Sequence, residues 1–214
     1  DPTPAPVPST ETAILDAAER VFAECGFHAA STRAIAQAAT ANPALIHYYF
    51  GSKEKLFQAV IARRSGAIND ERRARLAALH AAGPAALEAL LDALLRPTVA
   101  LGRDPARGGQ HYARLLAHVA TGTDARSRRL TAESYNAIAT VFIAEIAAAV
   151  PGLSPGAAVR GYLNAIVIGI SLMAPTGRAE DLSAGALAED DLDRTLSDAV
   201  RFVAAGIRAL AASD

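Results

Sequence analysis

Several residue types that often carry function are scarce in this sequence. Its 214 residues include one cysteine, Cys25, one methionine and no tryptophan. A single cysteine excludes an internal disulfide and suits a reducing compartment, so we expect a cytoplasmic protein. The formal net charge of −1 gives no overall electrostatic attraction to nucleic acid. A role in binding nucleic acid would therefore have to depend on local patterns.

Long apolar segments are also missing. The longest stretch without a charged side chain, residues 161–177, is too short to span a bilayer comfortably and contains Asn164, Ser171 and Pro175. We interpret it as a buried helix and expect no membrane association. The first ten residues, "DPTPAPVPST", lack the basic and apolar segments of a signal peptide, and their prolines predict a disordered lead over residues 1–10.

The residues that are abundant favour helix. Hydrophobic residues make up 51% of the sequence, and many of them are alanine and leucine, which lose little conformational freedom in a helix. Few runs of β-branched and aromatic residues indicate strands. We therefore predict an all-α fold.

Two helices are expected in the first part of the chain. Ser9 or Thr10 can cap a helix whose apolar residues recur at helical spacing, and Gly26 can end it in a left-handed conformation. The stretch "STRAIAQAAT" predicts a second, short helix with Ile35 and Ala39 facing inward.

Aromatic residues are concentrated in the stretch "ANPALIHYYFGSKEKL". Asn42 is a good N-cap, and Pro43 suits the first helical position, where its missing N–H costs nothing. A third helix of two turns is thus predicted over about residues 43–49, before Gly51. Ser52 caps a fourth helix. Two short helices joined by a tight turn form a helix-turn-helix unit.

Longer helices follow this unit. The fourth helix is predicted over about residues 53–81, and we expect its charged later part, "NDERRARLAALH", to face solvent. Turn residues then separate the remaining helices. We place these at residues 84–101, 106–121, 126–149, 155–174 and 191–211, with a short helical turn in the last break.

The pieces "ILDAAERVFAECGFHAASTRAIAQAAT" and "NPALIHYYFGSKEKLF" resemble the N-terminal domain of the TetR/AcrR family of bacterial transcriptional regulators. The shared order is helix, Gly-Phe, Thr-Arg-x-Ile-Ala, turn, aromatic cluster and Phe-x-Ser-Lys-Glu. The resemblance implies a helix-turn-helix DNA-binding domain over residues 11–58 and a helical effector-binding and dimerisation domain over residues 59–214. Family members often have Gly-Val-Ser where this chain has residues 40–42, and glycine where it has Ala44, so operator preference is expected to differ.

The resemblance also implies which residues contact DNA. The N-terminal end of the third helix can enter a major groove, small residues there allow close approach to base edges, and hydroxyl, imidazole and cationic groups can reach bases or phosphates. The DNA contacts predicted in this way are Thr32, Arg33, Asn42, Pro43, Ala44, His47, Tyr48, Tyr49 and Lys53.

Other residues of the aromatic stretch are interpreted as core. Leu45, Ile46 and Phe50 are expected to hold the short helices together. Of the two tyrosines, we expect Tyr49 to lie further outside than Tyr48.

The N-terminal region is not basic overall. Residues 1–66 contain six basic and six acidic side chains. Binding would then depend on the local placement of Arg33, Lys53, Lys55 and helix N-termini, with a shallow salt dependence.

Two stripes of residues are candidates for dimerisation. One consists of small residues in the predicted helix 155–174, and the other is the apolar face of the last helix. The resemblance implies that both pack against a second copy, whereas the alternative is that they fill the core of one chain. The two stripes are Gly161, Ala165 and Gly169, and Leu192, Leu196, Val200, Val203, Ile207 and Leu210.

By the same resemblance, the middle helices surround a small, largely apolar effector, either lipid-like or aromatic. The expected function is a homodimeric repressor that an effector releases from a roughly palindromic operator on double-stranded DNA; activation is the alternative. No enzyme activity, cofactor or metal is expected, and the competing hypothesis is an all-helical enzyme or carrier. The effector-binding residues predicted in this way are Tyr112, Leu115, His118, Tyr135, Ile138 and Phe142.

Overall fold

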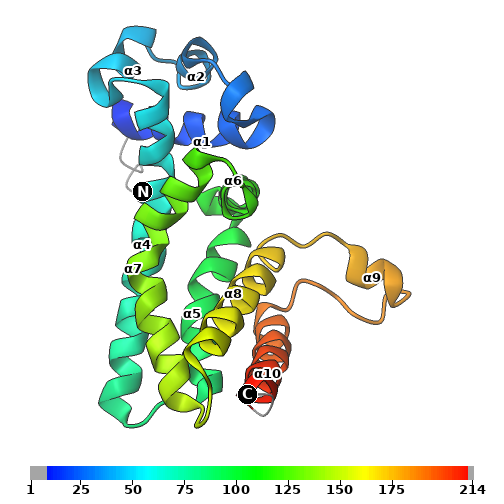
Figure 1. Ribbon diagram of the computed structural model, residues 1–214. Coiled ribbons are helices and arrows are strands. Elements are labelled where there is room, and N and C mark those ends of the chain that lie inside the picture. Colours follow the sequence, from blue (N-terminus) through cyan, green and yellow to red (C-terminus); the bar gives the residue numbers. More distant parts are fainter. Residues whose placement is uncertain (1–8, 212–214) are drawn as a thin grey trace, which may run out of the picture. The chain divides into compact units, whose positions relative to one another are not determined.

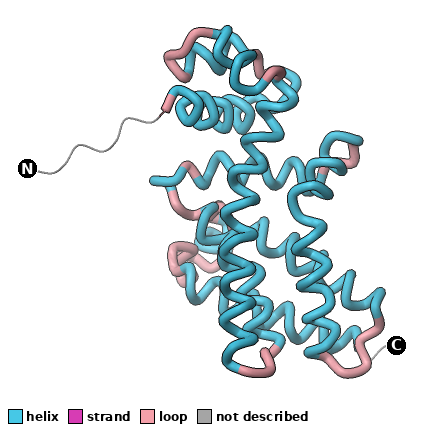
Figure 2. The backbone as a smooth tube through the Cα atoms, turned by 90° about the vertical axis from the view of Figure 1, so that its left-hand side faces the viewer, coloured by secondary structure: helices cyan, strands magenta, loops and turns pink. Residues whose placement is uncertain are grey.

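The computed structural model describes residues 9–211, and within this range the chain is helical with no strand, which confirms the predicted all-α fold (Figure 1, Figure 2). Most of the proline-rich lead predicted over residues 1–10 lies outside the described residues. The chain divides into two compact units, residues 1–64 and 65–214, and the division falls inside helix α4. The predicted domain boundary after residue 58 lies in the same helix and stays a prediction.

The first unit contains three helices and the beginning of a fourth. Each begins at a side-chain cap: Ser9 accepts from the Thr12 amide, Ser31 from the Ala34 amide, and Asn42 and Ser52 from amides of the helices that follow them. These caps explain why the boundaries agree closely with the sequence predictions. The helices are α1 (Thr10–Ala29), α2 (Thr32–Ala38), α3 (Pro43–Phe50) and α4 (Lys53–Ala82).

Helix α1 is interrupted where the sequence predicts its end. Gly26 has φ 75° and ψ 169°, a backbone conformation that favours glycine, and three more residues extend the element beyond it. The turn brings Phe27 back onto the unit's core, where its ring centroid lies 6.0 Å from that of Phe22 and 5.3 Å from that of Phe57. In α2, Ile35 and Ala36 are buried, whereas Ala39 is a half-buried C-cap residue rather than the inward residue expected.

The second unit begins within α4 and continues through six α-helices and one short 3-10 helix of the described chain. Its core lies among α5, α7, α8 and α10, together with Leu76 from the later part of α4. Helix α9 stands away from α8 and α10 at the end of two extended segments (Figure 1). The elements are α5 (Leu87–Gly102), η1 (Pro105–Arg107), α6 (Gly109–Thr121), α7 (Ala125–Ala149), α8 (Pro155–Ser171), α9 (Arg178–Leu182) and α10 (Leu192–Ala211).

Helix α8 is only partly the buried helix expected from the uncharged stretch at residues 161–177, because Gly161, Ala165 and Gly169 are buried while Leu163 and Val167 are exposed. None of the described helices combines the length and apolar character needed to cross a membrane.

The charged part of α4 does not face solvent throughout, contrary to the sequence prediction. Asn69, Arg72 and Leu76 are buried, while Asp70 and Arg73 are exposed. The three buried residues are three and four positions apart, so they occupy one face of the helix. This face packs into the second unit, so the polar side chains of Asn69 and Arg72 are buried there.

The two stripes predicted for dimerisation are mostly buried inside one chain. A Cβ added at Gly161 would lie 2.8 Å from Ile207, and one added at Gly169 would lie 2.9 Å from Leu95. The small residues of α8 therefore allow α10 and α5 of the same chain to approach closely. Ala165, Leu196, Val200, Val203 and Ile207 are also buried, and Leu192 and Leu210 are half-buried.

A different apolar surface is exposed on these two helices. Val159, Leu163 and Val167 recur every four residues along α8, and Phe202 protrudes from α10. We call these four residues the α8–α10 surface. For the residues of the two predicted stripes, the alternative is correct: they fill the core of one chain. The exposed apolar residues lie on other faces of the same two helices.

Candidate DNA-binding and effector sites

Helix α3 presents its N-terminal end to solvent. The Asn42 side chain accepts a hydrogen bond from the Ala44 amide at 2.9 Å, and Pro43 occupies the first helical position. Pro43 and Ala44 are exposed, whereas Ile46 on the opposite face is fully buried. A helix of two turns is thus anchored by one face and leaves small side chains free on the other.

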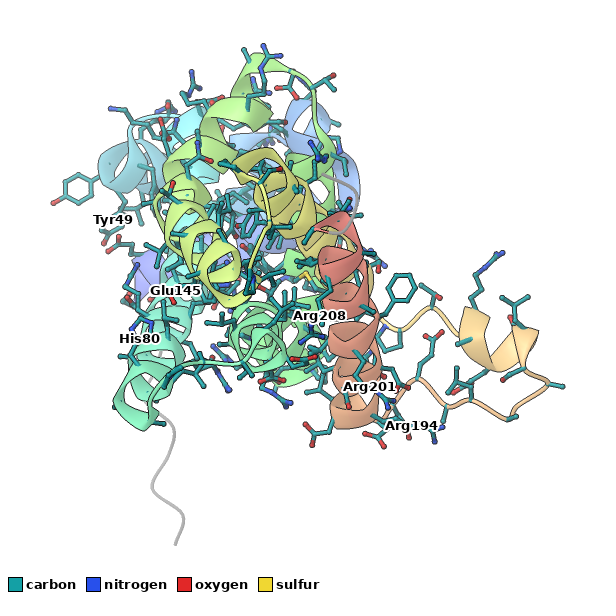
Figure 3. All side chains as sticks on the ribbon, turned by 60° about the horizontal axis from the view of Figure 1, so that its bottom comes forward. Tyr49, His80, Glu145, Arg194, Arg201 and Arg208 are labelled. Atoms are coloured by element: carbon teal, nitrogen blue, oxygen red, sulfur yellow. The ribbon has the colours of Figure 1, made fainter. Side chains whose placement is uncertain are left out.

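The polar and aromatic residues of α3 are also outside. Tyr48 is 79% exposed and Tyr49 is 40% exposed, so Tyr48, not Tyr49, is the outermost of the two. Their rings meet edge to face with centroids 5.1 Å apart, and Figure 3 shows Tyr49 pointing away from the ribbon. His47 is exposed and its Nδ1 lies 3.1 Å from the Gly51 carbonyl oxygen. Leu45 and Phe50 are half-buried, which agrees with their predicted core role.

Helix α2 places Arg33 in solvent next to its N-terminus. Thr32, the first residue of the helix, is half-buried, and the Ser31 hydroxyl caps the helix by accepting from the Ala34 amide at 3.0 Å. The Arg33 side chain is exposed.

Lys53 is hydrogen-bonded within the first unit. Its ammonium donates to the carbonyl oxygens of Phe27 (2.9 Å), His28 (3.4 Å) and Ala30 (2.9 Å), and it lies 4.5 Å from the Phe27 ring centroid. An ammonium has three N–H bonds, and three carbonyls accept them. Lys53 therefore ties the start of α4 to the end of α1, and its expected phosphate contact stays a prediction.

Two arginines of the first unit are also engaged. Glu19 on α1 is buried and accepts from Arg64 at 2.7 Å through both Nε and Nη2, and from Arg63 Nη2 at 3.2 Å. Arg63 Nη1 lies 2.7 Å from Asp16. These ion pairs join α1 to α4 within the first unit. The positive charges of Arg63 and Arg64 are thus paired with carboxylates of the same unit.

The residues predicted to bind an effector are not all brought together. Tyr112 and Tyr135 are joined by a hydrogen bond between their hydroxyl groups. Leu115 is buried on α6, but His118 on the same helix is exposed. Ile138 and Phe142 are buried in the core of the second unit.

Sequence reasoning missed Arg72, a buried polar residue near Tyr135. Arg72 donates from Nε to the Leu94 carbonyl oxygen at 2.9 Å and from Nη2 to Thr98 Oγ1 at 2.9 Å. Its Cζ lies 6.0 Å from the Tyr135 ring centroid. The sequence contained one signal that could have revealed this burial. Asn69, Arg72 and Leu76 are spaced so that they lie on one face of a helix, and that face also carries an apolar residue.

Neither of two cavities formed by described residues of the second unit consists mainly of the predicted residues. The smaller, of about 370 Å³, includes Ile138 together with Leu76, Ala77 and Val141. His80 also lines it and points toward Glu145, with Nε2 and Oε1 3.1 Å apart (Figure 3). The other five predicted residues line neither cavity.

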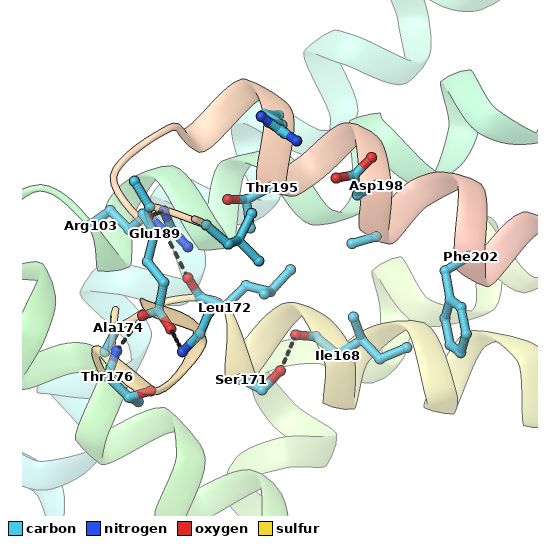
Figure 4. A pocket seen from close by; sticks show the side chains of 15 residues that line it. Arg103, Ile168, Ser171, Leu172, Ala174, Thr176, Glu189, Thr195, Asp198 and Phe202 are labelled. Atoms are coloured by element: carbon cyan, nitrogen blue, oxygen red, sulfur yellow. Dashed lines mark hydrogen bonds between the residues drawn. The ribbon is translucent and has the colours of Figure 1, made fainter. Parts of the chain in front are cut away.

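The larger cavity, of about 540 Å³, lies between the end of α8, the segment around α9 and α10 (Figure 4). Arg103 donates from Nε to the Leu172 carbonyl oxygen at 2.8 Å, and burial lowers its pKa while the charge of Glu189 opposes that shift. The Glu189 carboxylate accepts from the amides of Thr176 (2.6 Å), Gly177 (3.1 Å) and Ala179 (2.8 Å). These hydrogen bonds, that of Ala179 first, lower the pKa of Glu189. Glu189 thus fixes the segment that closes one side of the cavity.

Family models match both parts of the chain. Residues 14–60 match the model described as bacterial regulatory proteins of the tetR family, and residues 92–206 match the tetracyclin repressor-like C-terminal domain. The chain therefore belongs to the TetR family of transcriptional regulators, which confirms the resemblance seen in the sequence. It is accordingly a regulator and not an enzyme.

Relatives with curated names agree with the chain in its N-terminal part. The HTH-type transcriptional regulator UidR of Escherichia coli K12 is 46% identical over 52 residues, which are 24% of this chain and 26% of UidR. The regulator BetI of Rhizobium meliloti is 42% identical over 64 residues, 30% of this chain and 32% of BetI. The transcriptional repressor NicS of Pseudomonas putida is 46% identical over 52 residues, 24% of each chain. The matches thus span only a quarter to a third of these relatives.

Solved structures resemble the chain over nearly its full length. The fatty acid degradation regulator FadR of Bacillus halodurans has a TM-score of 0.66 and 16% identity, with 95% of this chain and 97% of that chain covered. FadR of Bacillus subtilis, solved with stearoyl-CoA, has a TM-score of 0.61 and 14% identity, with coverage of 93% and 98%. At such identities the likeness establishes the fold of both units.

Proposed function

We propose that this protein is a cytoplasmic, homodimeric repressor whose two α3 helices read a roughly palindromic DNA operator. The observation that supports this proposal is the exposed end of α3, where Pro43 and Ala44 leave room for base edges and Tyr48 and His47 offer polar groups. Helices held in this way enter the major groove of DNA. The relative from Pseudomonas putida is named as a repressor, which favours repression over activation.

The proposed DNA contacts come from α2, α3 and the turn between them. Exposed groups can reach base edges or phosphates, and the half-buried Thr32 can offer its hydroxyl at the start of α2. Lys53 is left out because its N–H bonds are directed at backbone carbonyls. The contacts proposed are Thr32, Arg33, Asn42, Pro43, Ala44, His47, Tyr48 and Tyr49.

The α8–α10 surface provides a face for the second copy. Four large apolar side chains exposed on adjacent helices can form the core of an interface when a copy covers them. Two copies related by a two-fold axis would carry two α3 helices, which matches the symmetry of a palindromic operator.

An effector bound in the second unit would release the DNA by a shift of population. The ligand must prefer the conformation that does not bind DNA, because equal affinity for both conformations changes nothing. The core of the second unit is apolar, and one structural neighbour was solved with stearoyl-CoA, so a largely apolar, lipid-like effector is the first class to test.

The experiment is a selection of bound duplexes from random DNA, followed by titration of the selected sequence. We expect a palindromic consensus, and we expect Tyr48→Ala or His47→Ala to lower affinity by about tenfold or more without changing the melting temperature. Ala120→Glu on α6, at an exposed position outside both proposed surfaces, serves as a control with unchanged affinity. Equal affinity for all duplexes would contradict the proposal.

A further inference from the structure

The guanidinium of Arg72 is buried in the second unit, and the residue is only 2% exposed. Three of its five N–H bonds have acceptors: Nε donates to Leu94 O, Nη2 to Thr98 Oγ1, and Nη1 to Asn69 Oδ1 at 3.3 Å. Asn69 is held in turn, because its amide donates to the Ser134 carbonyl oxygen at 2.8 Å. The position of the guanidinium is thus fixed by α4, α5 and α7 together.

No carboxylate of the described chain pairs with this charge. The groups that face Arg72 electrostatically are the hydroxyls of Tyr162, Tyr135 and Tyr112. Burial lowers the pKa of Arg72, and it raises the pKa values of Tyr135 and Tyr162, so the tyrosines keep their protons. A buried cation without an anion is costly, because the charge has lost its hydration and gained no ionic partner.

The remaining hydrogen-bonding capacity suits a planar anion. One N–H on each of Nη1 and Nη2 has no acceptor among residues 9–211, and two such donors match the two oxygens of a carboxylate. The tyrosine hydroxyls can donate to the same group.

We propose that Arg72 is the anchor for the carboxylate of a small apolar acid, with the hydroxyls of Tyr112 and Tyr135 beside it. This inference rests on the proposed function, because it names the chemical class of the effector. The acid group of the ligand neutralises Arg72.

Tyr135 lies beside this site. It is half-buried on α7, its ring stands over the guanidinium, and its hydroxyl is bonded to Tyr112 on α6. An acid bound at Arg72 would lie against the Tyr135 ring and the hydroxyl pair of Tyr135 and Tyr112. Arg72 belongs to α4, the helix that begins at Lys53 in the first unit, so binding at Arg72 perturbs a helix that both units share.

Arg72 could instead have only a structural role, in which its hydrogen bonds hold α4 against α5. The two roles differ in their response to ligand charge. If Arg72 has only a structural role, the protein does not prefer an acid over a neutral ligand of the same shape. If Arg72 binds the carboxylate, the protein prefers the acid.

The test compares acids with their neutral amides on the full-length protein. Calorimetry and thermal shift are measured with hexanoate, octanoate, decanoate and dodecanoate, each against the corresponding primary amide. We expect at least one acid to bind and raise the melting temperature, and its amide to bind about 30-fold more weakly, as for loss of a buried charge pair. Arg72→Met should abolish the preference, while Arg73→Met, which changes the exposed neighbour paired with Asp70, should keep it.

Equal binding of an acid and its amide, retention of the preference in Arg72→Met, or no binding by any acid would overturn the inference. If Arg72→Met does not fold, the Arg72→Lys variant tests the inference instead. Lysine keeps the positive charge but lacks the planar pair of N–H donors. The affinity for the acid should therefore fall, and the affinity for the amide should not. Unchanged acid affinity in that variant would also overturn the inference. Operator selection without ligand is independent of these results, so failure of the DNA-binding proposal can be told apart from failure of the acid site.

Discussion

The ammonium of Lys53 donates to the carbonyl oxygen of Phe27 at 2.9 Å and lies against the ring of the same residue. A lysine at the start of α4 thereby holds the turn that follows Gly26. Lys53→Met should lower the free energy of unfolding by about 1–3 kcal/mol, because hydrogen bonds from a charged donor are lost. Denaturant unfolding of the full-length chain, followed by circular dichroism, measures this change. Reduced DNA affinity with unchanged stability would instead show that Lys53 contacts phosphate.

The α8–α10 surface predicts the effect of a charge at its centre. Leu163 is 54% exposed in the single chain, and Leu163→Glu should weaken dimerisation by about 30-fold or more, since it removes a central contact and buries a carboxylate. Sedimentation equilibrium measures the dissociation constant, with Ala120→Glu as the control. An unchanged dimer would mean that the second copy binds elsewhere.

Two glycines make opposite predictions for the same substitution. A Cβ added at Gly109 would lie 1.8 Å from the Leu101 carbonyl oxygen, so Gly109→Ala should destabilise the protein by about 1–3 kcal/mol or more. Gly66 lies within α4, and nothing stands within 4 Å of its added Cβ. Gly66→Ala should therefore stabilise the protein by about 0.5–1 kcal/mol. Thermal unfolding of both variants distinguishes a steric requirement from simple helix propensity.

The N-cap of α7, Asp124, should make the stability of the protein depend on pH. The Asp124 carboxylate accepts from the Ser127 hydroxyl at 2.6 Å and from the Ser127 amide at 3.1 Å, and these bonds, the hydroxyl first, lower the pKa of Asp124 to about 2 from 3.8. A lowered carboxyl pKa contributes stability that is present above the unfolded value and is lost as the pH falls through the folded value. Asp124→Ala should thus lower the melting temperature near neutral pH. The difference from wild type should shrink between about pH 4 and pH 2, and a constant difference would show that the charge is not responsible.

The first unit could be predicted well because its signals are local. Asn42, Pro43 and Gly51 specify the ends of α3 through capping and backbone geometry, and these do not depend on distant residues. The exposure of Tyr48 and Tyr49 was ranked in the wrong order, since both occupy the outer half of a short helix and only packing separates them.

The second unit was predicted less well because its decisive features depend on which helices meet. Gly161 and Ala165 form a stripe that would suit a partner chain or the same chain equally, and only the position of Ile207 settles the matter. The burial of Arg72 could not be derived from charge, because arginine is normally exposed. It depends on acceptors contributed by Leu94 and Thr98, far along the sequence.

The pairing of Glu19 with Arg63 and Arg64 has a consequence for the search for an operator. With these two arginines neutralised and Lys53 occupied, the basic side chains left exposed in the first unit are Arg20, Arg33 and Lys55. Random chromosomal sequence is bound mainly through its phosphates, so it should retain such a protein weakly and briefly. We expect the molecule to travel mainly through free solution between encounters, and the residence time at the operator to be determined by base contacts from α3.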